Sequence, residues 1–290
     1  DAAAAATDGN GLSEATAGAL ATFTVYANDA NGARLHAGGV AFDATLTPSG
    51  STGGSAIAFT RLASGDAGAS GETLSAGEGV VVDRADGTYD AYYVVERSGT
   101  YDLDVQVGGA SINGFSTAMS VTAYAGATSA SATTMQVATD AHVFPSASTA
   151  GATVTTRVTA LDALGNARCY ADAGDGADYF EVSVTVDGVE VSNSDVSLSQ
   201  TQIKASGVVD VALTPTKAGT HVVSVRLGGE HVRGSPATVA VSAAAADAET
   251  SGATLAGDAL FGGRVGVERT ARLSARDAHG NSVNATGLSS

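Results

Sequence analysis

The stretch GTYDLDVQVGG at residues 99–109 returns as GTHVVSVRLGG at residues 219–229, so its opening Gly-Thr and its closing Gly-Gly are both shifted by 120 positions. Between these ends, residues facing one side are mostly apolar and their neighbours are more polar, which is the period-two pattern of a strand with one buried face. An irregular pattern that recurs at a fixed offset is typical of an array of similar modules. The chain is therefore predicted to consist of repeated β-rich units.

A second motif, D-A-x-G, occurs three times and indicates the number of modules. Its copies begin at Asp29, Asp162 and Asp277. Asp accepts hydrogen bonds from the backbone that follows it and Gly adopts positive φ at little cost, so the motif closes a turn between strands. The residue eleven places before each Asp is also a glycine, namely Gly18, Gly151 and Gly266. The three copies predict two whole modules and the first part of a third.

Alternating apolar residues continue on both sides of the two long patterns, and no segment shows a helical stripe. The predicted fold class is all-β, with tandem immunoglobulin-like antiparallel β-sandwiches. The predicted domains are residues 1–125, residues 126–243, and a truncated third module at residues 248–290. The first module contains a long Gly/Ser-rich insert at about residues 48–79, which we expect to project as a functional or disordered loop.

The composition limits the partners. The chain has 290 residues, 44% of them hydrophobic, and a net charge of −16. Such a charge repels nucleic acid and anionic lipid surfaces, so neither is an expected partner. Because no apolar run reaches the roughly 20 residues that span a bilayer, no direct membrane insertion is expected. The single cysteine, Cys169, cannot form an intrachain disulfide.

No catalytic or cofactor site is predicted, so the chain is not expected to be an enzyme. No zinc or EF-hand motif is present. Asp172, Asp175 and Asp178 lie in a Gly-Ala loop, which is either a solvated loop or a calcium site. The histidines are scattered too widely to place a base beside a nucleophile; they are His36, His142, His221, His231 and His279.

The motifs taken in order resemble those of filamin repeats, the immunoglobulin-like rod modules of actin-crosslinking proteins. Asp86-Gly87-Thr88-Tyr89, Gly99-Thr100-Tyr101 and Gly108-Gly109 are similar to the D-G-T-Y, G-x-Y and x-G-G segments of those repeats. Gly234-Ser235-Pro236 resembles their G-S-P segment, and Asp162-Ala163-Leu164-Gly165-Asn166 resembles their D-x-x-G-N turn. The second module departs from the pattern at His221, where the first has Tyr101, an aromatic residue expected to bond to the backbone at a sandwich corner.

The resemblance implies a site for partner proteins at a sheet edge. An extended peptide would add as a strand between the third and fourth strands and pair with their free N–H and C=O groups. In the first module the third strand contains Val40 and Phe42, and the fourth contains Val80 and Val82. These four residues are the predicted groove.

Three functions remain open. The first is a scaffold rod segment of a larger filamin-repeat protein, cytoplasmic and cytoskeletal, that binds partner strands or itself. Since nothing in the chain resembles a calponin-homology head, contact with actin would go through parts outside it. The second is the ectodomain of a cell-surface adhesion or gamete-recognition protein, and the third is a passive spacer beside an enzyme.

Overall fold

The computed structural model describes residues 2–66, 68–70, 73–112, 118–137, 145–169, 178–191, 195–203, 206–255, 266 and 271–283. These residues form strands, loops and two short 3-10 turns, η1 (Ala2–Ala4) and η2 (Asn10–Leu12). Within the described ranges there is no helix long and apolar enough to cross a membrane. The chain divides into two compact units: Asp1–Ala132 with Ala160–Ala177 and Lys204–Gly207, and Thr133–Thr159 with Asp178–Ile203 and Val208–Ser290.

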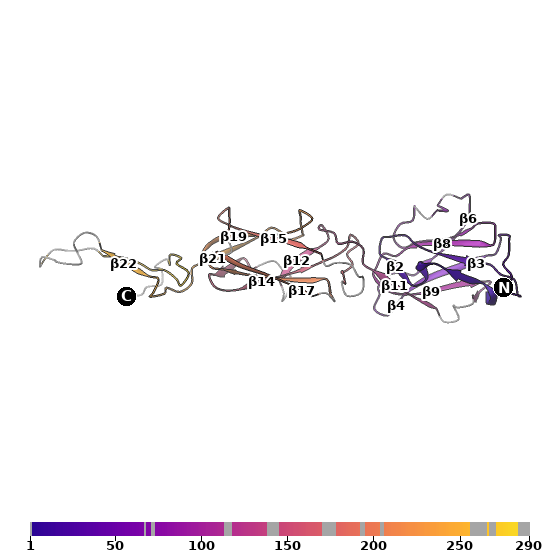
Figure 1. Cartoon of the computed structure of the whole chain (residues 1–290), viewed down its shortest axis with the longest axis horizontal. Helices are drawn as coiled ribbons and strands as arrows, with labels where there is room; N and C mark the ends of the chain where they lie inside the picture. Colours follow the sequence, from indigo (N-terminus) through magenta and orange to yellow (C-terminus); the bar gives the residue numbers. More distant parts are fainter. Residues whose placement is uncertain are drawn as a thin grey trace. The chain divides into compact units, whose positions relative to one another are not determined.

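The first repeat lies in the first unit and has two sheets (Figure 1). One sheet has the order β1-β3-β8-β7-β6, with strands Ala6–Asp8, Ala21–Tyr26, Thr88–Val94, Glu78–Asp83 and Thr60–Ala63. The other has the order β2-β11-β9-β4-β5, with strands Glu14–Thr16, Met119–Tyr124, Gly99–Val107, Phe42–Ser49 and Ile57–Ala58. The short β10 (Ala110–Ser111) pairs with β9.

The inward faces of these two sheets share one hydrophobic core. Phe23 and Val25 of β3, Tyr89 of β8, and Leu103 and Val105 of β9 all belong to it and are buried. Each fully buried side chain of this size stabilises the fold by about 1.5–3 kcal/mol. The predicted alternation therefore produces a two-layer β-sandwich, which confirms the predicted fold class.

The strands of the second repeat belong to the second unit, and their order follows that of the first repeat, except that no described strand corresponds to β6. One sheet is β12-β14-β18-β17, with strands Thr134–Val137, Val154–Thr159, Val208–Pro215 and Val196–Ile203. The other is β13-β21-β19-β15-β16, with strands Ala147–Thr149, Ala237–Ser242, Gly219–Leu227, Phe180–Val186 and Val189–Glu190, and β20 (Glu230–His231) pairs with β19. The strand pairing is also similar in the two repeats. Phe42 pairs with Val107, and Phe180 pairs with Leu227, which lies 120 positions after Val107.

The third segment is described only in part. β22 (Gly252–Leu255) and β23 (Ala271–Ser274) form a two-stranded antiparallel sheet. The assignment of residues 248–290 to the start of a third repeat, like the other module boundaries, stays a prediction.

Part of the insert at residues 48–79 lies against the sandwich instead of projecting from it. β5 pairs with β4, and β6 pairs in parallel with β7, so residues 57–63 cross from one sheet to the other. We call residues 57–63 the strap. Phe59 at its centre is 8% exposed, and its ring centroid lies 6.2 Å from that of Phe23 and 5.8 Å from that of Tyr93. The apolar side chains of the strap hold it on the core.

The two repeats differ at the sandwich corner. The Tyr101 hydroxyl donates a 2.7 Å hydrogen bond to the Arg97 carbonyl, as the corner role predicts. His221, in the matching position, is fully buried, and its Nδ1 lies 3.3 Å from the Gly219 carbonyl. Burial, the largest effect, lowers the pKa of His221, so the ring is held in its neutral form.

Candidate partner-strand grooves

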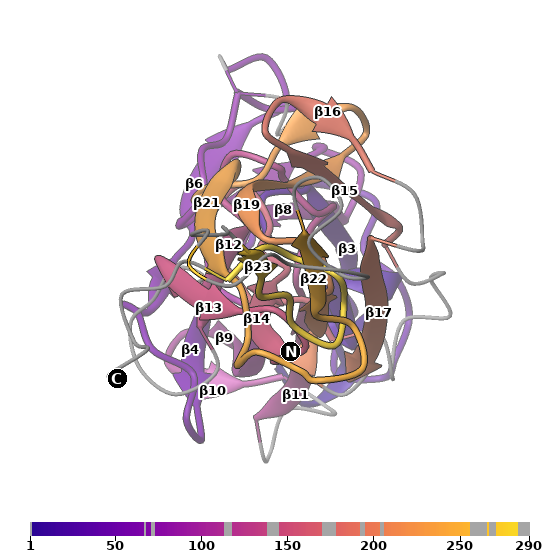
Figure 2. The same ribbon diagram turned by 90° about the vertical axis from the view of Figure 1, so that its left-hand side faces the viewer.

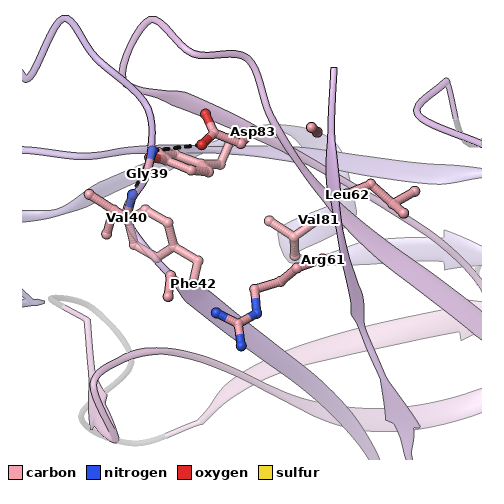
Figure 3. A pocket seen from close by; sticks show the side chains of 10 residues that line it. Gly39, Val40, Phe42, Arg61, Leu62, Val81 and Asp83 are labelled. Carbon is pink, nitrogen blue, oxygen red and sulfur yellow. Dashed lines mark hydrogen bonds between the residues drawn. The ribbon is translucent and has the colours of Figure 1, made fainter. Parts of the chain in front are cut away.

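A pocket of about 270 Å³ lies in the first repeat between the start of β4 and the strands β6 and β7. Figure 3 shows Gly39, Val40 and Phe42 on one side of it and Leu62 and Val81 on the other. Two hydrogen bonds hold its wall in place. The Gly39 amide donates to Asp83 Oδ2 at 2.7 Å, and the Val40 amide donates to the Tyr89 hydroxyl at 2.8 Å.

The structure places the four predicted groove residues in two different surroundings. Val40 and Phe42 line the pocket (Figure 3). Val80 and Val82 lie on the other face of β7, in a cluster with Ala69 against which partly buried side chains of the insert pack. Successive residues of a strand point to opposite faces, so Val81 is the β7 residue that faces the pocket and the core.

In the first repeat the strap pairs with β4 and β7, the two strands between which the resemblance predicts an added peptide. Gly79 of β7 has no side chain and so leaves room for the strap. A Cβ atom at Gly79 would lie 3.0 Å from Phe59 Cγ and 3.1 Å from Ile57 Cγ2. An ion pair between Arg61 and Asp43, at 3.4 Å, also links β6 to β4. Both side chains are more than half exposed, so this pair adds little stability.

In the second repeat, no described strand pairs with β17 in the way that β6 pairs with β7, and β16 pairs only with the end of β15. Gly79 pairs with Tyr93 in the first repeat. Leu213 is the residue 120 positions after Tyr93, and it pairs with Leu198 of β17. Leu198 therefore occupies the position that Gly79 has in the first repeat. Leu198 is 36% exposed. It lines a groove of about 150 Å³ between β15 and β17, together with Val182, Val184, Val191 and Val196.

Few strand pairs cover this groove within the part of the chain that the structure describes. β16 pairs with β15 only opposite Thr185 and Val186, and a long 3.4 Å bond joins the Val191 amide to the Val184 carbonyl. Over the described residues, β17 forms the end of its sheet. Figure 2 shows β15, β16 and β17 on the same side of the second repeat. Over the residues that the structure describes, no strand pairs with β15 on this side between Phe180 and Ser183.

The other predicted sites are placed as follows. Asp172 and Asp175, with most of the 172–178 loop, lie outside the described residues, as does His142. Among the residues that the structure describes, no group of three or more His, Cys, Asp or Glu side chains is arranged to hold a metal ion. Cys169 is half-buried.

Comparison with known proteins agrees with this architecture. The family model of the Filamin/ABP280 repeat matches residues 1–117 and 129–238. The chain therefore belongs to the Filamin/ABP280 repeat family. No curated protein matches it in sequence.

Solved structures with a similar fold include two bacterial proteins. The Escherichia coli adhesin FdeC is 23% identical, and the match covers 99% of this chain and 77% of FdeC with a TM-score of 0.56. InvD of Yersinia pseudotuberculosis is 17% identical, with 98% of this chain and 73% of InvD covered and a TM-score of 0.50. At these identities the likeness is one of fold.

Proposed function

We propose that this chain is a structural segment of a cell-surface adhesion protein. The observation that carries the proposal is the likeness in fold to the adhesin FdeC over 99% of the chain. The filamin-type repeats fit this role, because an array of small sandwiches spans distance while each unit keeps its own core. Of the functions left open by the sequence, the comparisons favour the cell-surface alternative over the cytoplasmic rod. The family and fold are typical of structural domains, and the proposal assigns no catalysis to the chain.

The proposed partner site is the groove between β15 and β17 of the second repeat. Its lining residues Val182, Val184 and Leu198 suit a peptide with apolar side chains at alternate positions. Glu181 of β15 is exposed and Glu190 lines the groove, so the peptide would also carry basic residues. Each added backbone hydrogen bond contributes about 0.5–1.5 kcal/mol, so four of them give about 2–6 kcal/mol before the cost of ordering the peptide.

The surface location is tested with an antibody against this chain on cells of the source organism. Labelling of intact cells, and loss of the label after brief protease treatment of those cells, are expected. Labelling that appears only after the cells are made permeable would contradict the proposal and favour the cytoplasmic rod.

The groove is tested by selecting peptides from a displayed library on the whole chain and measuring their affinity for two variants. Leu198→Lys places a charge in the groove, so it should weaken binding at least about tenfold. Leu20→Lys is the matched control, since Leu20 is 45% exposed and lies in the first repeat. Equal weakening by both variants, or none by Leu198→Lys, would contradict the groove assignment.

A further inference from the structure

The second D-A-x-G turn binds backbone groups outside itself. The Asp162 carboxylate is buried, and its Oδ1 accepts hydrogen bonds from the amides of Leu164 and Asn166 at 2.9 and 2.8 Å, which closes the turn. Its Oδ2 accepts a 2.8 Å bond from the Gly126 amide, just after the last strand of the first repeat. One carboxylate therefore closes the turn and fixes the chain that leaves the preceding repeat.

The residue after this turn makes a second bridge to the first repeat. Asn166 Oδ1 accepts a 3.0 Å hydrogen bond from the Ser98 amide, and its Nδ2 donates to the Glu96 carbonyl at 3.0 Å and to Asp162 Oδ2 at 2.9 Å. Glu96 and Ser98 lie between β8 and β9. Residues 160–177, which follow β14 of the second repeat, accordingly belong to the same compact unit as the first repeat.

The variable residue of the motif contacts the conserved glycine of the repeat before it. Gly18 has a φ of 75°, and a Cβ atom there would lie 3.2 Å from Cδ1 of Leu164. In the next copy Gly151 has a φ of 84°, and a Cβ atom there would lie 2.7 Å from Nε2 of His279. Gly18 and Gly151 thus leave space for a side chain of the following repeat.

The third turn repeats the same bonds on the second repeat. Asp277 Oδ2 accepts from the Ala244 amide at 2.9 Å. Asn281 Oδ1 accepts from the Ala218 amide at 2.8 Å, and its Nδ2 donates to the Thr216 carbonyl at 2.7 Å. Thr216 and Ala218 stand 120 positions after Glu96 and Ser98. The arrangement is a repeated feature of this chain.

The carboxylates of both turns are held in their ionised form. Burial alone raises the pKa of Asp277, but hydrogen bonds from the Asn281 side chain and from backbone amides outweigh it and bring the pKa to about 2. The pKa of Asp162 is lowered in the same way against the effect of burial. Ionised carboxylates make the stronger hydrogen bonds.

The first D-A-x-G turn closes with hydrogen bonds of its own. Asp29 Oδ1 accepts from the amides of Asn31 and Ala33 at 2.8 and 2.9 Å, so the turn closes in the usual way. Asp29 is half-exposed, and the position of Asn166 is occupied by Ala33. Closing the turn therefore does not require the Asn.

We propose that the D-A-x-G-N turn is an interlock through which a repeat docks on the end of the repeat before it. The partner is the preceding repeat, which offers a glycine at the position of Gly18 and the backbone groups equivalent to those of Glu96 and Ser98. The interlock couples the stability of consecutive repeats. The inference uses none of the groove residues, so it can be tested independently of the proposed function.

Hydrogen exchange of single amides in the whole chain tests the interlock. Asn166→Ala should accelerate exchange of the Ser98 amide roughly 5- to 10-fold and leave Ala218 unchanged, and Asn281→Ala should do the reverse. Asp29→Ala is the matched control, because it removes the same bonds within a turn and should change neither amide.

Acceleration confined to residues 162–166, with Ser98 as protected as in the parent chain, would overturn the proposal. Asn166→Leu keeps a side chain of similar size if the alanine variant fails to fold. It can neither accept from the Ser98 amide nor donate to the Glu96 carbonyl, so it should also accelerate Ser98. Unchanged exchange at Ser98 in this variant would likewise overturn the interlock.

Discussion

Replacing Phe59 by alanine tests whether the strap is part of the first sandwich. Phe59 is 8% exposed and its ring lies against those of Phe23 and Tyr93. Removing a buried phenylalanine side chain costs about 3–5 kcal/mol. The strap pairs with the sheets over only a few residues and can collapse partly into the space, so we expect the lower end, about 3 kcal/mol.

The loss is measured by urea unfolding followed by near-ultraviolet circular dichroism of tyrosine. Six of the eight tyrosines lie in residues 1–125, so the signal reports mainly on the first repeat. For a module of this size, 3 kcal/mol corresponds to a fall in Tm of about 10–15 °C. Phe59→Leu is the matched control and should cost less than about 1.5 kcal/mol. A loss below about 1 kcal/mol for Phe59→Ala would refute the packing of the strap on the core.

Two further predictions concern the folded repeats. Gly87→Ala should destabilise the first repeat by about 2–4 kcal/mol in urea unfolding, because the new Cβ would lie 1.8 Å from the Leu35 carbonyl oxygen at a φ of 88°. Gly32→Ala, at a similar φ but with no atom within 4 Å, should cost only about 1–2 kcal/mol, and equal losses would contradict the contact. Because burial lowers the pKa of His221 below 6.5, protons bind preferentially to the unfolded chain; stability should be full above about pH 6.5 and fall as the pH drops below that value. His221→Phe should flatten this part of the pH profile, and an unchanged slope would assign it to other groups.

The long alternating patterns could be interpreted from sequence because each has one buried face. In β9, Tyr101, Leu103 and Val105 are buried and their neighbours are less so, and the same order holds in β19. Regular alternation identifies both the strand and its inward face.

The groove could be predicted only in part. Val80, Val81 and Val82 are all buried, because the core covers one face of β7 and the insert covers the other. A strand that is apolar on both faces shows no alternation, so the sequence alone does not indicate which valine faces the groove. The groove of the second repeat was missed. The 120-residue offset leads from the fourth strand to β17, but the third strand is displaced by 138 residues, since Phe42 corresponds to Phe180.

The strap and the interlock depend on contacts between distant residues. Asn166 bonds to residues 68 and 70 positions earlier, and a short motif cannot reveal such partners. Gly79 was the available signal for the strap, since a glycine inside a strand often marks a place where another segment approaches closely. For the interlock, the signal was the glycine that precedes each D-A-x-G turn.

Stretching a single molecule of the whole chain tests the central claim most directly. If the chain is a series of β-sandwiches that each close their own core, unfolding under force should give two main peaks. Each should release about 120 residues, or about 400 Å of extended chain at roughly 3.4 Å per residue. Smooth extension without peaks, or one event that releases the whole length, would contradict the account.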